Sequence, residues 1–429
     1  MFARWQFVGS NPEAGVSATS SRPAPQLRIL LWASVFKLGY WAILLTGVCL
    51  WGHLYSPHVV YWPRPSPPVF VSHFTAYDGY NYLKLSKEGY KDGEPACVLY
   101  PLWPFLIGSI SRLVGGTSPV VGLVLANGLS VAAWIALYRI VRQRWGPGIA
   151  KWTLIFLVAY PGSLFYQFIY SESLFLLLVV GLWWALEGSN TVFACLLAFL
   201  LPLTRPIGVF CILPIMWHVL SAWRSDPPTW MGMLTKASVS PERAAASGQR
   251  PVADSSEPGG DNPASSRSVC LMLALFCGWY CYLALMWFRT GDPFQGFEAQ
   301  RFWGVHSVSN LWNPPKFFLE WLNANEWHEL RGSLLDRCAF LLLICCLPTI
   351  WRLDKRLVVW TYVLGILPAM SGMFTSFTRF GSTTFPMFIA LSVWLGDRSR
   401  WRLRYGLLVV FGVLHALVAW RYVTFRWAG

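Results

Sequence analysis

Charged residues are scarce in this sequence, and their scarcity argues against most classes of soluble protein. Only 13% of the 429 residues are charged, whereas 55% are hydrophobic. A typical soluble domain carries about 25% charged residues. Aromatic residues are abundant, with 26 Trp, 28 Phe and 17 Tyr. A water-soluble particle of this size could not bury so much apolar surface. We therefore predict an all-α polytopic membrane protein.

Acidic residues are also few, and the balance of charge is basic. The chain has 34 Lys and Arg against 20 Asp and Glu, a net charge of +14. These charges lie between apolar runs, so we interpret them first as topology signals and as attraction to anionic head groups of membrane lipids. No nucleic-acid partner is expected despite the basic balance.

Several motifs of soluble catalysis are missing. The sequence has no Walker loop, Rossmann glycine fingerprint, zinc motif or Ser/His/Asp signature, which argues against a nucleotide-driven pump or a soluble nucleotide-sugar enzyme. The ten cysteines are spread mainly over apolar segments. The pairs Cys277 with Cys281 and Cys345 with Cys346 have no His or acid beside them. We predict neither a metal site nor a cofactor.

Apolar runs long enough for a bilayer of about 30 Å recur along the chain, and we count about ten or eleven helices. The run 191–221 accommodates one or two passes. The run 98–114 is short and carries Pro101 and Pro104, so we interpret it as a re-entrant or interfacial helix. The expected spans are 29–51, 119–138, 152–170, 172–187, 191–221, 269–288, 336–351, 357–373, 380–396 and 405–423.

Basic residues in short loops set the orientation. Clusters at 139–151, 352–356 and 398–404 mark the cytoplasmic side. The number of membrane crossings agrees with these side assignments only if 98–114 does not cross the membrane and 191–221 crosses it twice. The predicted organisation is a cytoplasmic tail (1–28), a first transmembrane helix (29–51), a non-cytoplasmic loop with interfacial or re-entrant helices (52–118), transmembrane helices (119–222), a flexible cytoplasmic linker (223–268), a transmembrane helix (269–288), a non-cytoplasmic loop (289–335) and C-terminal transmembrane helices (336–429).

The first outer loop contains the strongest catalytic candidate, Asp78. This acid follows the first membrane helix and lies among Tyr77, Tyr80 and Tyr82. A partly desolvated carboxylate in that position can accept a proton from a sugar hydroxyl. The alternative is a solvated loop acid, or an N-cap for a helix over 79–88.

Two further charges occur within apolar stretches. Glu172 lies at a junction of two apolar segments, where it either contacts substrate or follows an N-cap at Ser171 and interacts with the helix dipole. Arg205 has no carboxylate within a helical turn, so its anion is Glu172 or a lipid phosphate, or else it reaches the head groups from a helix end.

The second outer loop and the last outer link add polar groups beside the bilayer. Asp292, Gln300, Arg301 and Trp303 suit a site for phosphate and sugar, although an interfacial aromatic belt with balancing charges has the same composition. Arg379 lies in a very short outer link. With Arg205 and Arg301 it would supply cations for an isoprenoid phosphate at the membrane surface.

Five blocks of residues follow one another along the chain. They are Tyr77-Asp78-Gly79 with Tyr82-Leu83, Glu88-Gly89-Tyr90 and Tyr100-Pro101-Leu102-Trp103-Pro104; Pro161-Gly162-Ser163 with Tyr170-Ser171-Glu172-Ser173-Leu174-Phe175; Leu203-Thr204-Arg205-Pro206 with Gly208; Gly291-Asp292-Pro293-Phe294 with Gln300 and Trp303; and Thr378-Arg379-Phe380. In this order the blocks resemble the PIG-V-like mannosyltransferases, the GPI mannosyltransferase II family with its prokaryotic relatives, within the GT-C class of integral-membrane glycosyltransferases. Tyr77 stands where the family usually has Trp, and Leu99-Tyr100 replaces a phenylalanine pair.

The resemblance implies a GT-C-like bundle and inverting transfer of a hexose, typically mannose. The donor would be a polyprenyl- or dolichyl-phosphate sugar, and the acceptor a hydroxyl on a glycolipid or similar molecule at the non-cytoplasmic face. It implies Asp78 as general base and Arg205, Arg301 and Arg379 as phosphate ligands. The residues expected to shape the sugar and acceptor sites are Glu172, Asp292, Gln300, Trp303 and Tyr82.

Two other functions remain open at this stage. A transporter or flippase of lipid-linked sugars also needs outward cations, but it should keep ionisable groups near the bilayer midplane and show inverted repeats. An assembly subunit of a larger membrane complex is the third option. The sequence does not decide whether a small membrane partner subunit is required. The absence of a retention tail and of a cleaved leader favours a bacterial inner membrane over the endoplasmic reticulum.

Overall fold

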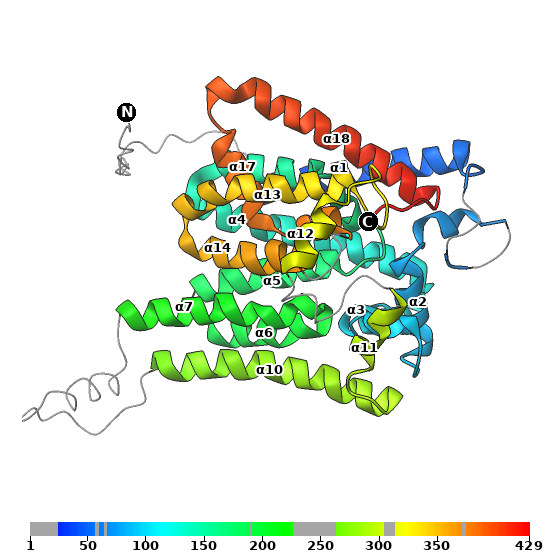
Figure 1. Ribbon diagram of the computed structural model, residues 1–429, viewed down its shortest axis with the longest axis horizontal. Helices are drawn as coiled ribbons and strands as arrows, with labels where there is room; N and C mark the ends of the chain where they lie inside the picture. The colour runs from blue at the N-terminus through cyan, green and yellow to red at the C-terminus, as the bar shows by residue number, and fades with distance from the viewer. Residues whose placement is uncertain are drawn as a thin grey trace, which may run out of the picture.

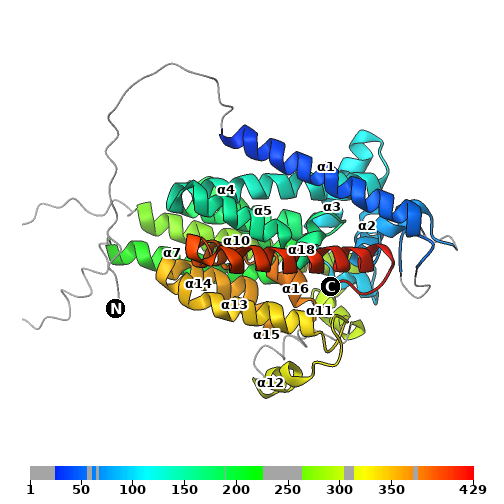
Figure 2. The same ribbon diagram turned by 90° about the horizontal axis from the view of Figure 1, so that it is seen from above.

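The computed structural model describes residues 25–55, 60–63, 67–188, 190–225, 263–303, 314–370 and 375–429. Helices dominate it, and most run along the long axis of one bundle (Figures 1 and 2). Over the described residues, the strand-like pairings are two isolated bridges, Tyr61 with Ala76 and Glu326 with Ser333. The predicted all-α fold is confirmed. Most of the expected tail (1–28) and linker (223–268) lies outside the described residues.

Within the described ranges, five helices are long and apolar enough to cross a bilayer. This confirms a polytopic membrane protein, although several of the remaining predicted spans are shorter or broken. The long helices are α1 (Pro25–Trp51), α4 (Ser118–Ala159), α10 (Pro263–Thr290), α13 (Leu334–Leu353) and α18 (Trp401–Val423). The shorter helices of the bundle are α5 (Glu172–Glu187), α6 (Thr191–Thr204), α7 (Ile212–Ser225), α14 (Lys355–Thr361), α15 (Leu367–Met370) and α17 (Phe385–Trp394).

Helix α4 contains two predicted spans because it breaks and returns. Gly146 has φ +88°, a backbone conformation that glycine adopts readily, and the first half of α4 ends there. Pro147 begins the second half. The hydroxyl of Ser130 in the first half donates to the carbonyl oxygen of Tyr166, seven residues beyond the end of the second half. The first half of α4 therefore packs on the segment that follows the second half. The second half ends at Ala159 rather than the expected residue 170, because Pro161 opens a 3₁₀ turn, η3 (Pro161–Tyr166).

The apolar run 191–221 also divides into two helices, α6 and α7. The division falls at Arg205, which has extended backbone angles, and Pro206 follows it. A 3₁₀ turn, η4 (Pro206–Cys211), then leads into α7. Gly208 in this turn packs so closely on the carbonyl of Leu201 that a Cβ would clash. Arg205 is thus at the junction of two helices rather than inside one.

The two outer loops pack against each other at one end of the bundle, where α2, α3 and α11 gather (Figure 1). The indole Nε1 of Trp303 donates to the carbonyl of Pro95 at 3.1 Å. Tyr100 stacks on Tyr282 with 4.3 Å between ring centroids. The elements at this end are α2 (Asp78–Glu88), η2 (Pro95–Val98), α3 (Leu102–Val114), α11 (Gln295–Glu298) and η5 (Ala299–Phe302). Helix α12 (Pro314–Leu322) packs beside the start of α13, where Arg337 donates to the carbonyl of Trp321.

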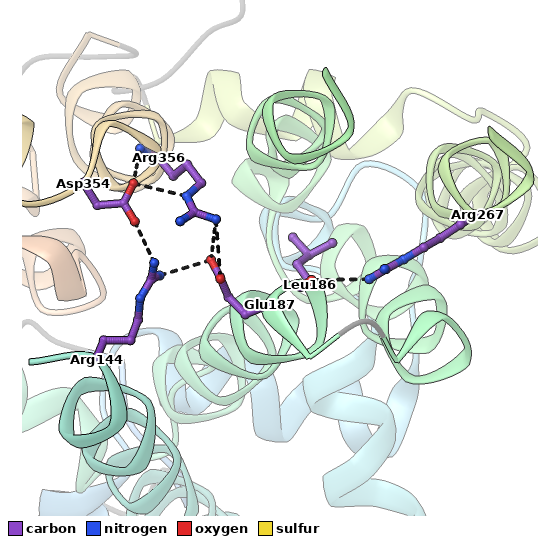
Figure 3. Close-up of polar contacts among 6 residues, drawn as sticks. All are labelled: Arg144, Leu186, Glu187, Arg267, Asp354 and Arg356. Carbon is purple, nitrogen blue, oxygen red and sulfur yellow. Dashed lines mark hydrogen bonds and ion pairs between the residues drawn. The ribbon is translucent and has the colours of Figure 1, made fainter. Parts of the chain in front are cut away.

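An ion-pair network joins the helix ends that carry the predicted cytoplasmic basic loops (Figure 3). Arg144 contacts Glu187 at 3.1 Å and Asp354 at 3.0 Å, and Arg356 contacts Glu187 at 3.2 Å. Nearby, Arg267 donates to the Leu186 carbonyl. This network lies at the end of the bundle where α7 ends and α10 begins, opposite α2 (Figure 1). Arg144 and Arg356 are therefore at the opposite end of the bundle from Asp78, and the side of the membrane that each end faces stays a prediction.

Candidate functional site

Asp78 opens helix α2 and points into the protein rather than capping the helix. Tyr77 takes the N-cap position with φ +55°, an unusual conformation for a bulky residue. The Asp78 side chain is 18% exposed, and its Oδ2 accepts a hydrogen bond of 2.6 Å from Nη1 of Arg379. The alternative interpretation, Asp78 as the N-cap of a helix over 79–88, is therefore wrong, since the helix begins at Asp78 and Tyr77 takes the cap position.

Glu172 is the buried centre of the site. Its side chain is completely inaccessible, and its Oε1 accepts hydrogen bonds from Nη1 of Arg205 at 2.6 Å and from Nε of Arg379. Ser171 takes the N-cap position of α5, but its hydroxyl accepts a 3.0 Å hydrogen bond from Tyr82 instead of capping. Ser171 therefore occupies the cap position while Glu172 forms ion pairs. Together these contacts join α2, α5 and Arg205.

Arg379 links the two carboxylates. It lies in the short helix α16 (Phe377–Gly381), and its side chain is 8% exposed. The result is a continuous chain, Asp78–Arg379–Glu172–Arg205, from four segments distant in the sequence. Burial lowers the pKa of Arg379, but the Glu172 and Asp78 carboxylates raise it further, so the pKa is above its ordinary value. The guanidinium therefore keeps its charge.

Aromatic rings surround the two cations. The Arg379 guanidinium lies 4.5 Å from the ring centroid of Tyr170 and 5.3 Å from that of Phe165. Phe380 contacts both cations, at 5.0 Å from Arg205 and 5.8 Å from Arg379. Such rings stabilise a desolvated cation. They also exclude water from the sides of the site, which strengthens its electrostatic interactions.

Within the described part of the second outer loop, the predicted polar residues make no hydrogen bond or ion pair to this chain of ion pairs. Arg301 is exposed, with its guanidinium over the ring of Phe302 at 5.1 Å. Asp292 accepts a hydrogen bond from the backbone of Phe294 at the end of α10. Gln300 is half-buried in η5, and Trp303 binds the backbone of Pro95 as described above. Their functional roles remain predictions.

Two buried polar residues escaped the sequence analysis. Lys37, in the middle of α1, donates to the carbonyl of Tyr166 and to Oε1 of Gln167, and it thereby anchors α1 to the link before Glu172. Asp336, in the first turn of α13, accepts a hydrogen bond from the backbone N–H of Thr378. An ionisable residue within or at the edge of an apolar run was the available signal for both.

The arrangement provides cations and an accessible base in one place. A guanidinium has five N–H donors, more than Arg205 and Arg379 use on these carboxylates, so each retains donors for an incoming anion. Asp78 is more exposed than Glu172 or Arg379. The site therefore has the groups needed to bind a phosphate and to accept a proton beside it.

No protein-family model matches the sequence, and no curated protein matches it. Among solved structures, the chain is similar to the oligosaccharyltransferase of Archaeoglobus fulgidus in its apo form, with 11% identity and a TM-score of 0.44. It is also similar to the archaeal oligosaccharyltransferase AglB from that organism in complex with an inhibitory peptide and a dolichol-phosphate, with 12% identity and a TM-score of 0.43. Both alignments cover 93% of this chain and 55% of the other, so the chain spans about half the length of these proteins.

Proposed function

We propose that this protein is an integral-membrane glycosyltransferase. It transfers a hexose, which we propose to be mannose, from a polyprenyl- or dolichyl-phosphate donor to a hydroxyl of a glycolipid or related acceptor on the non-cytoplasmic face. The observation that carries the proposal is the chain of ion pairs from Asp78 through Arg379 and Glu172 to Arg205. These residues were chosen from separate sequence blocks, and they meet at one end of the bundle.

Asp78 is the proposed general base. Its carboxylate removes the proton of the acceptor hydroxyl while the hydroxyl oxygen attacks C1 of the sugar, and the bond between C1 and the phosphate oxygen breaks. The lipid phosphate departs with the electron pair of that bond. Glu172 cannot take this role, because its side chain is completely buried between two arginines.

Arg379 and Arg205 are the proposed ligands of the donor phosphate. Negative charge develops on the leaving phosphate, and preorganised cations in a water-poor site stabilise that charge without reorganising. A phosphate that takes over donors of Arg379 would also release Asp78 from its ion pair. Arg301 is proposed to approach the phosphate from the second outer loop, and the residues proposed to shape the sugar and acceptor sites are Glu172, Asp292, Gln300, Trp303 and Tyr82.

The test is transfer by the purified protein. Radiolabelled polyprenyl-phosphate-mannose is incubated with candidate lipid acceptors and with wild-type protein or the Asp78→Asn variant. We expect a labelled glycolipid with the wild type and none with the variant. Movement of the labelled donor across a vesicle membrane without any new glycosidic product would overturn the proposal in favour of a transporter.

A further inference from the structure

We propose that Asp336 is a positioning residue that holds Arg379 in place for its contact with Asp78. Asp336 is fully buried, and its Oδ1 accepts a 2.6 Å hydrogen bond from the backbone N–H of Thr378, the residue before Arg379. Among the described residues, its side chain makes no hydrogen bond to Asp78 or Arg379, so it acts through the backbone. The inference rests on the proposed function only for the part that Arg379 plays in transfer.

The segment that carries Arg379 needs external support. Helix α16 has only five residues, too few to be stable by itself. Ser376, just before it, has φ +60°, a conformation that costs free energy in a residue with a side chain. Such a segment keeps its shape only where neighbouring groups determine it.

The peptide groups of Thr378 are held from two sides. Asp336 accepts from its N–H, and Gly162 of η3 packs directly on its carbonyl, where a Cβ would clash with the oxygen. Helix α13 and η3 therefore clamp the backbone immediately before Arg379. Any shift of Asp336 moves the Thr378 amide and, with it, the guanidinium that bridges two carboxylates.

The second outer loop fixes Asp336 in turn. The hydroxyl of Ser333 accepts from the backbone N–H of Asp336 at 3.2 Å, and Nδ1 of His328 lies 3.2 Å from the same hydroxyl. Thr375 donates to the carbonyl of Leu330 at 3.0 Å, which joins this loop to the Arg379 segment a second time. The outer loop thus reaches the site through hydrogen bonds of His328, Leu330 and Ser333.

A purely structural role for Asp336 makes a different prediction. An acid in the first turn of a helix stabilises the helix through its negative charge. Holding the Thr378 amide requires only an acceptor oxygen at the right distance, which an asparagine side chain also provides. Asp336→Asn should therefore preserve the position of Arg379. Asp336→Glu keeps the charge but displaces the oxygens by a methylene, and should disturb it.

The experiment measures the accessibility of Arg379 directly. Full-length wild type, Asp336→Asn, Asp336→Glu and Asp336→Ala are treated with phenylglyoxal in detergent, and modified arginines are mapped by mass spectrometry. We expect slow modification of Arg379 in the wild type and in Asp336→Asn. In Asp336→Ala we expect modification about tenfold faster, as the segment opens locally. Asp354→Ala is the matched control, because it removes a carboxylate from the other end of α13 and from the network in Figure 3.

Turnover gives the second readout. Asp336→Ala should lower kcat about tenfold or more with little change in KM, and Asp336→Asn should restore kcat. Equal Arg379 modification in the wild type and Asp336→Ala would overturn the inference, as would a less protected Arg379 in Asp336→Asn than in Asp336→Glu. If Asp336→Ala does not fold, the rates of Arg379 modification in Asp336→Asn and Asp336→Glu alone test the inference. If the modification pattern is as expected but the wild type transfers no sugar, the proposed function fails while the positioning holds.

Discussion

Nη1 of Arg379 lies 2.6 Å from Oδ2 of Asp78, although the two residues are 301 positions apart in the sequence. The contact joins the first outer loop to the last outer link and closes the site. It also means that Asp78 is engaged until another anion competes for Arg379. Binding of a donor phosphate and release of the base are thereby coupled in the proposed reaction.

Replacing Asp78 by asparagine should abolish measurable transfer. Loss of a general base typically lowers the rate by about 10²–10⁴-fold, and the amide has nearly the same shape, so the protein should fold. Initial rates with a radiolabelled donor measure the effect. Asp92→Asn, in the same outer loop, is the control and should transfer at the wild-type rate. An Asp78→Asn enzyme of full activity would remove the base from the proposed mechanism.

Replacing Arg379 by lysine should be more damaging than replacing Arg205 by lysine. Arg379 uses Nε for Glu172 and Nη1 for Asp78, and one ammonium cannot reproduce that planar fork. Arg205 makes one contact to Glu172 through Nη1. We expect about a 10²–10³-fold loss of kcat for Arg379→Lys. The comparison is made at equal amounts of folded protein, and equal losses in the two variants would contradict the bridging role.

Glu172→Gln should destabilise the protein far more than Glu187→Gln. Neutralising Glu172 leaves two buried guanidiniums without their shared carboxylate, which costs about 3–5 kcal/mol. Glu187 is 27% exposed within the ion pairs of Figure 3, where we expect a cost of about 1 kcal/mol or less. Thermal unfolding in detergent measures both, and a larger effect at Glu187 would count against the buried centre.

Acidification should weaken the attachment of α18 to the first outer loop through His73. Nδ1 of His73 lies 2.6 Å from the carbonyl of Val423, and burial lowers the pKa of His73 below its ordinary value of 6.5, more than this carbonyl raises it. Because the unfolded chain binds the proton more tightly, this contribution to stability is present above about pH 6.5 and is lost as the pH falls below it.

The measurement is the unfolding midpoint between about pH 7.5 and pH 5.5. We expect the midpoint of the wild type to fall on acidification, and His73→Gln to show a smaller fall. An identical pH dependence in the two proteins would show that His73 does not contribute.

Local features of the fold were predictable from the sequence. Helix α5 begins and ends at the predicted residues, because Ser171 and Gly188 flank its apolar run. The break at Arg205 follows from Pro206. The end of α4 at Ala159 was missed, because the aromatic and aliphatic residues of 160–170 continue the apolar run, although Pro161, Gly162 and Gln167 interrupt it. Hydropathy indicates which residues are buried, so it does not distinguish a buried 3₁₀ turn from a buried helix.

The site was predictable only in part. Asp78, Glu172, Arg205 and Arg379 were singled out because they lie beside or within apolar runs, and the resemblance assigned their roles. No spacing rule could show that Arg379 bridges the two acids. Asp336 was missed because its partner is a backbone N–H 42 positions away, and a backbone group leaves no trace in a sequence. An acid at the start of an apolar run resembles an ordinary helix terminus.

Helix α6 has 14 residues and is therefore about 21 Å long, less than the roughly 30 Å of a typical hydrocarbon layer. Its apolar side chains Val192 and Leu196 are exposed, as expected of a helix face that packs against lipid. A bilayer adapts to a short apolar surface by thinning beside it. Head groups next to α6 would then descend toward Arg205 at its far end, and a lipid-borne phosphate could reach the cations while its tail stays in its own leaflet.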